Sequence, residues 1–149
     1  MPAVLDSLYA RIAPEISIDL GTANTPVYVR GHGVRFVEPT VVAVDSGSGE
    51  VITVGEGARQ MMGRTPRNIT VIRPLRNGVV SNYKYTEALV RQLMDRALRG
   101  RALIPPRVIV GVPGSATDIE RKAVREAAIG RWLRSIRFGM SENSSYSSR

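Results

Sequence analysis

Short apolar runs separated by polar turns dominate the first half of the chain. Residues 16–20 and 26–30 are largely apolar and predict two strands joined by the short loop between them. Further strands are predicted at 34–37, at 40–44 after an interruption at Glu38-Pro39, at 51–54 and at 69–74. The glycine- and serine-rich stretch 45–50 predicts a turn, and residues 55–62 predict a short helix.

Helical spacing becomes clear after residue 85. Thr86 is the expected N-cap of a helix that Gly100 ends. The apolar positions of this helix follow the spacing i, i+1, i+4, i+5 and are Leu89, Val90, Leu93, Met94, Ala97 and Leu98. This stripe predicts a helix with one face packed on a core.

The next segment has the order of an α/β unit. Residues 107–113, RVIVGVP, form a nearly continuous apolar run, which is typical of a strand buried on both faces. Thr117 and Glu120 form a capping box, which predicts a second helix ending at Gly130. The residues that we expect this helix to bury are Ile119, Ala123, Val124 and Ala127. Strand, turn and capped helix in this order favour an α/β fold.

The two ends of the chain differ from its middle. Residues 3–12 place their apolar side chains on one face of a short helix, and Pro14 ends it. This helix either packs on the body of the protein or anchors it to a membrane. Its polar face has Arg11 opposed by Asp6, which favours the first alternative because such anchors are usually rich in Lys or Arg. Residues 131–149 are rich in serine, and we expect this tail to be disordered.

Composition narrows the classes of function. The chain has 149 residues, 43% of them hydrophobic, which suits one domain with its own core. It has no cysteine, no apolar run near the ~20 residues of a membrane span and no signal-peptide pattern, so we expect a cytoplasmic location. The net charge of +8 suits nucleic acid, an anionic membrane or a phosphate ligand. Because aromatic residues are few, we expect no nucleic-acid partner.

The loop DLGTAN, residues 19–24, has the parts of a phosphate site. Gly21 lets a ligand approach the backbone, and successive N–H groups in such a turn form an anion-binding concavity. Thr22 and Asn24 add short side-chain donors, while Asp19 would suit a Mg²⁺ ion placed between the carboxylate and a phosphate. The alternative is an ordinary hairpin made of turn-favouring residues. The loop is neither a Walker A motif nor a Rossmann fingerprint.

Longer stretches of the chain resemble the MreB family of bacterial actins. They are SIDLGTANTPVYVRGHGV, VEPTVVAVDS, VGEGARQMMGRTPRNITVIRPLRNGVVSNY and RVIVGVPGSATDIERKAVREAA. They stand in the family's order and spacing from about residue 15 to Gly130. DLGT alone also occurs in the wider superfamily of actins and DnaK-type chaperones. The GRTP segment and its IRP…GV continuation point to MreB within that superfamily.

The resemblance implies an α/β, actin-like ATPase (ribonuclease H-like) fold, present in part as subdomains IA and IB. Residues 15–130 would form this partial domain I, with the IB insertion at roughly 45–82, between an N-terminal helix at 1–14 and a divergent tail at 131–149. The resemblance implies that the phosphates of ATP are contacted by Gly21, Thr22, Ala23 and Asn24. Asp19 would hold Mg²⁺ through water.

The function that the resemblance implies is that of an ATP-binding cytoskeletal protein. Such proteins form filaments at the inner face of the cytoplasmic membrane, organise cell-wall synthesis and determine rod shape. The implied partners are the chain itself or a full-length homologue in filaments, the cytoplasmic membrane and the cell-wall synthesis machinery. The resemblance also supports the membrane-anchor alternative for residues 3–12 as strongly as the packed helix.

The chain departs from the family at three places. After Gly130 it lacks the family's Glu-Glu-Pro motif with its catalytic glutamate, and Glu142 is not assigned that role, so we name no catalytic residue and expect an impaired, truncated form. Pro26 replaces a usual leucine at a strand start, and Asn77 replaces a usual aspartate without clear consequence. The rival functions are another ATPase or phosphotransferase of the superfamily, and a basic membrane- or nucleic-acid-binding adaptor without ATP.

Overall fold

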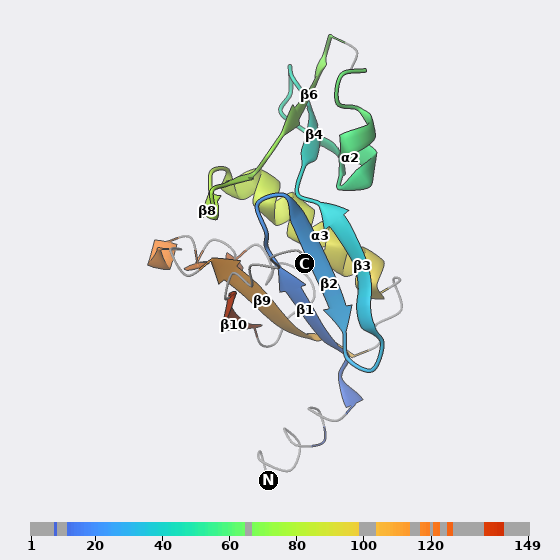
Figure 1. Ribbon diagram of the computed structural model, residues 1–149, viewed down its shortest axis with the longest axis vertical. Coiled ribbons are helices and arrows are strands. Elements are labelled where there is room, and N and C mark those ends of the chain that lie inside the picture. The colour runs from blue at the N-terminus through green and yellow to red at the C-terminus, as the bar shows by residue number, and fades with distance from the viewer. Residues whose placement is uncertain are drawn as a thin grey trace, which may run out of the picture.

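Two sheets and a long helix between them make up most of the structure (Figure 1). The computed structural model describes residues 8, 12–64, 67–98, 104–113, 117–119, 121, 122, 125, 126 and 136–141. Helix α3 (Tyr83–Leu98) lies behind the larger sheet and reaches toward the smaller one. The fold is therefore α/β, as the sequence predicts.

The larger sheet has five strands in the order β10-β9-β1-β2-β3. Its strands are β1 (Glu15–Asp19), β2 (Asn24–Val29), β3 (Gly33–Pro39), β9 (Arg107–Pro113) and β10 (Ile136–Ser141). The strands β10, β9 and β1 run parallel, whereas β2 and β3 pair antiparallel. The carboxyl ends of the three parallel strands therefore meet at the edge where the β1–β2 loop turns.

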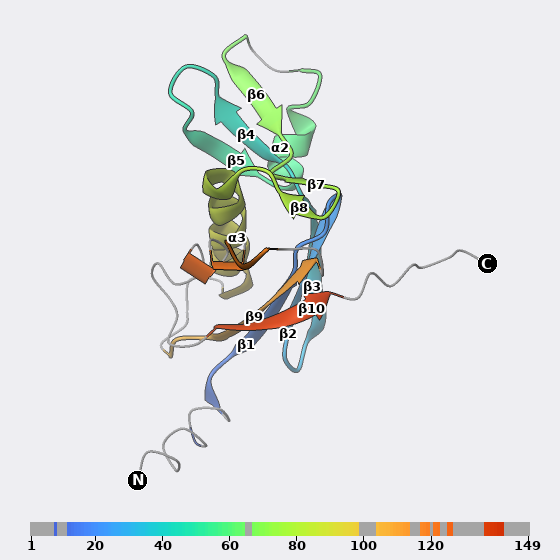
Figure 2. The ribbon, with the colours of Figure 1, turned by 90° about the vertical axis from the view of Figure 1, so that its left-hand side faces the viewer.

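The smaller sheet is inserted between β3 and β9 and stands above α3 (Figure 2). It has the order β5-β4-β6, with β4 (Val42–Asp45), β5 (Val51–Val54) and β6 (Ile69–Ile72), and helix α2 (Glu56–Gln60) covers it. A two-stranded ribbon, β7 (Leu75–Arg76) and β8 (Val79–Val80), leads from this sheet to α3. This ribbon is not among the strands that the sequence predicts.

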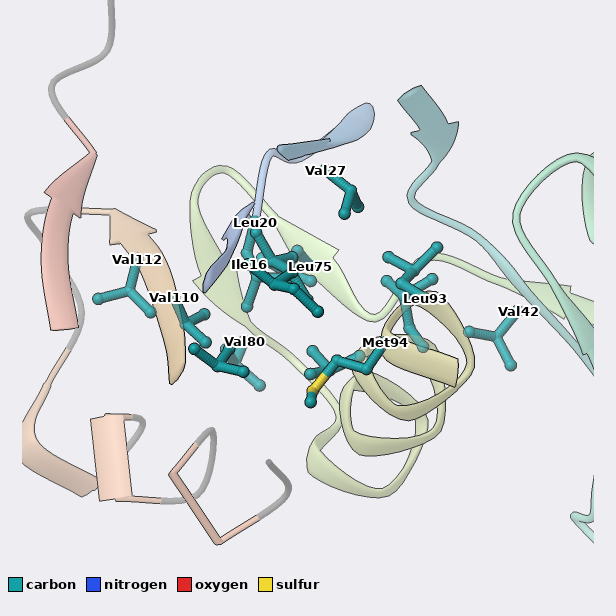
Figure 3. Packing of buried hydrophobic residues seen from close by; sticks show 14 of the residues in the cluster. Ile16, Leu20, Val27, Val42, Leu75, Val80, Leu93, Met94, Val110 and Val112 are labelled. Carbon is teal, nitrogen blue, oxygen red and sulfur yellow. The ribbon is translucent and has the colours of Figure 1, made fainter. Parts of the chain in front are cut away.

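One hydrophobic cluster joins both sheets to α3 (Figure 3). Its members alternate along the strands and follow the predicted stripe of α3; they include Ile16, Ile18, Val27, Val42, Val44, Leu89, Val90, Leu93, Met94, Val108, Val110 and Val112. On β9, however, Ile109 and Gly111 are only half-buried. The expectation that residues 107–113 are buried on both faces is therefore wrong, because α3 covers one face only among the described elements.

A buried carboxylate fastens the smaller sheet to the rest. Glu38, near the end of β3, accepts the backbone N–H of Glu56 at the start of α2, at 2.7 Å. It also forms an ion pair with Arg96 of α3, whose guanidinium stacks on the ring of Phe36, 4.3 Å from its centroid. Glu38 therefore connects its own strand, β3, to both α2 and α3.

The start of α3 differs from the prediction. The helix begins at Tyr83, and Asn82 caps it, because the Tyr85 N–H donates to Asn82 Oδ1 at 3.1 Å. Thr86 lies in the first turn, where its buried hydroxyl donates to the Asn82 carbonyl at 2.8 Å. The N-cap prediction for Thr86 is therefore wrong, and the predicted stop at Gly100 lies outside the described residues.

The two prolines near the loop are accommodated by the sheet. Strand β3 continues through Glu38-Pro39, where we expected an interruption, because β3 is an edge strand and tolerates proline. Pro26 lies in the part of β2 that pairs with β3 alone, since the pairing of β1 with β2 begins at Val27. Both prolines therefore stand where a missing N–H has little cost.

A strand occupies part of the tail that we expected to be disordered. Residues 136–141 form β10, which pairs in parallel with β9 over six positions. The backbone bonds of a ladder do not depend on side-chain identity, and apolar residues alternate within the segment IRFGMS. This alternation places Ile136, Phe138 and Met140 in register with Val108, Val110 and Val112.

Several expectations concern residues that are only partly described. Ile119, predicted to be buried, is 73% exposed. The predicted helix positions Glu120, Ala123, Val124, Ala127 and Gly130 lie outside the described residues, as does most of the segment 3–12. From that segment Leu8 and Ile12 are described, and each is 55% exposed. Within the described part of the chain, no helix combines the length and apolar character needed to cross a membrane.

Candidate functional site

The loop between β1 and β2 is tied to the strand next to β1. The backbone N–H of Leu20 donates to the Gly111 carbonyl of β9 at 3.0 Å, and the Leu20 side chain is buried in the core. The N–H of Gly21 turns back to the Asp19 carbonyl, also at 3.0 Å. The loop therefore leaves the sheet at the carboxyl ends of the parallel strands, where open α/β sheets bind their ligands.

Asp19, the last residue of β1, presents an unpaired oxygen. Its Oδ1 atom is buried and has no hydrogen-bond partner among the described residues. Gly111 stands opposite Asp19 in the parallel ladder, and Gly139 stands opposite Gly111. A Cβ atom added to Gly111 would lie 2.8 Å from Asp19 Oδ1. Glycine at this position therefore makes room beside the carboxylate.

Gly21 is required by the shape of the loop. A Cβ atom at this position would lie 2.2 Å from the carbonyl oxygen of Asn24, which no side chain tolerates. Ala23 and Asn24 are exposed, and Thr22 is half-buried. Within the described residues, the backbone N–H groups of Thr22 and Ala23 have no hydrogen-bond partner. The loop therefore offers unused donors at its surface.

Thr22 contacts a turn that is distant in the sequence. Its Oγ1 accepts the backbone N–H of Gly78 at 2.9 Å. Asn77 and Gly78 have φ angles of 50° and 75° and join β7 to β8, which is the pattern of a two-residue type I′ hairpin. Asparagine tolerates a positive φ, so Asn77 suits this turn.

Thr40 bonds the same loop from the opposite side. Its hydroxyl donates to the Gly21 carbonyl and its backbone N–H donates to the Ala23 carbonyl, both at 2.8 Å. The hydroxyl of Thr25 lies 2.9 Å from that of Thr40. All five predicted site residues thus belong to one loop, which the structure joins to Thr40, Gly78 and Gly111.

Sequence reasoning missed these three supporting residues. A glycine inside the apolar run of β9 was a signal for Gly111, since such glycines often mark a close approach. The Asn-Gly pair between short apolar runs was a signal for the hairpin at Gly78. No local pattern marks Thr40, because it contacts the loop only when the folded chain brings the two segments together.

The arrangement suits a hydrated cation with a phosphate better than a metal cage. No group of three or more His, Cys, Asp or Glu side chains gathers into a metal site in the parts of the chain that the structure describes. A single carboxylate beside free N–H donors is the set that Mg²⁺-phosphate ligands use, since Mg²⁺ keeps several waters. The buried, unpaired Asp19 oxygen and the space at Gly111 fit such a group.

The strand order of the larger sheet, together with the small sheet inserted between β3 and β9, defines a partial actin-like fold. Similar solved structures include MreB5 of Spiroplasma citri bound to ADP, with a TM-score of 0.74 and 29% identity over 87% of this chain and 38% of that one. A non-polymerising MamK mutant bound to AMPPNP has a TM-score of 0.67 at 20% identity, which shows the fold alone. The family model described as MreB/Mbl protein matches residues 13–136, and the chain belongs to this family.

Curated relatives agree with this assignment. The cell shape-determining protein Mbl of Bacillus subtilis is 45% identical over 116 residues, which are 78% of this chain and 35% of the relative. The cell shape-determining protein MreB of Escherichia coli is 44% identical over 127 residues, 82% of this chain and 37% of the relative. The chain thus spans about a third of the length of the curated relatives it matches. The family and the partial actin-like fold expected from the sequence are confirmed.

Proposed function

We propose that the β1–β2 loop binds the phosphates of ATP together with Mg²⁺. The observation that carries the proposal is the buried, unpaired Oδ1 of Asp19 beside the space at Gly111. An unpaired buried carboxylate oxygen is costly, and a hydrated cation would relieve that cost. The nucleotides named in the MreB5 structures, ADP and AMPPNP, support a ligand of this class.

Each residue of the loop has a separate task in this proposal. The N–H groups of Thr22 and Ala23 and the side chain of Asn24 donate to phosphate oxygens, and Gly21 keeps the backbone accessible. Asp19 orients the hydrated ion through water, and the bound ion neutralises phosphate charge. No residue is assigned a catalytic role.

At the level of the cell, we propose a role in determining cell shape. The names of the Bacillus and Escherichia relatives support this role. The chain would act through filaments with itself or with a full-length homologue, at the inner face of the cytoplasmic membrane and with the cell-wall synthesis machinery. Because the chain spans about a third of those relatives, its own affinity for nucleotide should be weak, since an actin-type ligand contacts more of the protein.

A titration with and without Mg²⁺ tests the nucleotide proposal. We expect wild-type protein to bind ATP weakly and only with Mg²⁺, and Asp19→Asn to weaken that binding about tenfold, which corresponds to ~1.4 kcal/mol. Without Mg²⁺, Asp19→Asn should raise the free energy of unfolding by about 1 kcal/mol, because it removes the charge of a carboxylate whose Oδ1 atom is buried and unpaired.

Asp95→Asn is the matched control, because Asp95 is exposed on α3. It should leave both the affinity and the stability unchanged. Equal Mg²⁺-dependent affinity in wild type and Asp19→Asn would contradict the proposed role of Asp19. Isothermal titration and urea unfolding give the two quantities.

A further inference from the structure

Thr40 makes two hydrogen bonds to one loop from the segment that connects the two sheets. It lies between β3 and β4, and its side chain is fully buried. Its hydroxyl bonds the Gly21 carbonyl and its N–H bonds the Ala23 carbonyl. Two of the loop's carbonyl groups are therefore held by a single residue outside the loop.

The direction of the hydroxyl chain follows from its partners. The Gly21 carbonyl can only accept, so the one hydroxyl proton of Thr40 is used there. The contact between the hydroxyls of Thr25 and Thr40 must then have Thr25 as donor. Thr25 is also fully buried. The chain Thr25 to Thr40 to Gly21 is thus satisfied and orients the Thr40 hydroxyl toward the loop.

Holding a carbonyl also aims the N–H on the other side of the same peptide bond. In a planar trans peptide the C=O and the following N–H point in opposite directions. Fixing the Gly21 carbonyl toward Thr40 therefore directs the Thr22 N–H away from Thr40. Fixing the Ala23 carbonyl does the same for the Asn24 N–H. The Thr22 N–H is one of the unused donors of the loop.

We infer that Thr40 is a positioning residue for the phosphate loop. It acts through the Gly21 and Ala23 carbonyls and does not touch the ligand itself. Its hydroxyl keeps the donors of the loop aimed at the ligand before binding, which reduces the ordering that binding requires. This inference rests on the proposed Mg²⁺-ATP site, but its structural part, an ordered loop, can be measured without a ligand.

Three substitutions of the complete chain test the role of the hydroxyl. Thr40→Val keeps the shape of the side chain and removes the hydroxyl, and Thr40→Ser keeps the hydroxyl. Thr86→Val is the matched control, because Thr86 is also buried and its hydroxyl also donates to a backbone carbonyl at 2.8 Å, but at the N-terminus of α3. The affinity for Mg²⁺-ATP is measured by titration, and the order of the amides of residues 21–24 by ¹⁵N heteronuclear NOE.

We expect Thr40→Val to bind Mg²⁺-ATP about tenfold more weakly, with more mobile amides in the loop. Thr40→Ser should remain within about twofold of wild type, and Thr86→Val should lower the unfolding midpoint while keeping wild-type affinity and loop order. Thr25→Val, which leaves the bond from Thr40 to Gly21 in place, should weaken binding about two- to threefold and serves if Thr40→Val does not fold.

The outcomes separate the inference from the proposed function. Wild-type affinity in Thr40→Val, or equal losses in Thr40→Val and Thr40→Ser, would overturn the positioning role. If wild-type protein binds no Mg²⁺-ATP, the proposed function fails. The inference about Thr40 is then tested only by the measured order of the amides of residues 21–24. Unchanged loop order in Thr40→Val would overturn it, and increased mobility confined to residues 21–24 would support it.

Discussion

Asp19 and Gly111 face each other across two parallel strands, and the absence of a side chain at Gly111 shapes the surroundings of the carboxylate. A glycine inside a strand normally weakens it, because glycine raises the backbone entropy of the unfolded chain and has no side chain to pack. Here the missing Cβ atom leaves room for Asp19 Oδ1, which is buried and has no hydrogen-bond partner among the described residues. The cost of this glycine to the strand and the room for the Asp19 carboxylate therefore have the same cause.

Gly111→Ala should therefore weaken the binding of the ligand as well as the fold. The added methyl group would lie 2.8 Å from Asp19 Oδ1, so the carboxylate must turn away. We expect about tenfold weaker binding of Mg²⁺-ATP by titration. The free energy of unfolding should fall by about 1–2 kcal/mol.

Gly57→Ala provides a closely matched control for that change. Its added Cβ would also lie 2.8 Å from a side-chain oxygen, Thr53 Oγ1, but on α2 and far from the loop in the sequence. It should keep wild-type affinity. Similar losses of affinity in both variants would show that the effect of Gly111→Ala comes from general strain in the protein.

Among the elements, α3 illustrates how a cap is set by the chain before it. Asn82 supplies the capping oxygen to Tyr85, and the hydroxyl of Thr86 is occupied within the first turn. Asn82→Ala should lower the free energy of unfolding by about 1 kcal/mol in urea unfolding. Asn82→Asp keeps a capping oxygen and should remain close to wild type. Equal stability of the alanine and aspartate variants would contradict the assigned cap.

The elements that were predicted correctly are those whose signal is local. The stripe of α3 and the short apolar runs of β1 and β2 depend on neighbours within a few residues. Both the cap at Asn82 and the pairing of β10 depend on choices between nearly equal local signals. Threonine, as at Thr86, is also a favoured capping residue, and the alternation in IRFGMS is short and contains a charge. Tertiary contacts decide such cases.

The candidate site shows the same division. Asp19, Gly21, Thr22, Ala23 and Asn24 could be proposed from six consecutive letters and a family resemblance. Their supports, Thr40, Gly78 and Gly111, lie 16, 54 and 87 positions after Asn24 along the chain. A local sequence pattern does not predict contacts between residues that are so far apart along the chain. The ligand roles of the five loop residues remain predictions.

For the whole molecule, the pairing of β10 with β9 decides whether the larger sheet has four or five strands. Backbone amides of residues 136–141 that bond β9 should exchange with solvent slowly, as strand amides do. Hydrogen exchange followed by mass spectrometry measures this protection. Complete exchange of this segment at the earliest time point would contradict the strand.

A proline in β10 gives a sharper version of that test. Phe138→Pro removes one ladder N–H and should speed exchange in both β10 and β9, because β9 loses its neighbour on that side. Phe138→Leu keeps the N–H and should retain protection. Unchanged protection of β9 in the proline variant would show that the two strands do not depend on each other.

The parallel pairing of β1 with β9 also has a consequence in time. Glu15 is in register with Arg107, which is 92 positions later in the chain (107 minus 15). At a synthesis rate of about 5–20 residues per second, β9 leaves the ribosome roughly 5 to 20 s after β1. During that interval β1 can pair with β2, but its other edge, beside Ile16 and Ile18, has no partner. The nascent chain must therefore stay free of wrong pairings for seconds before its central strand is enclosed.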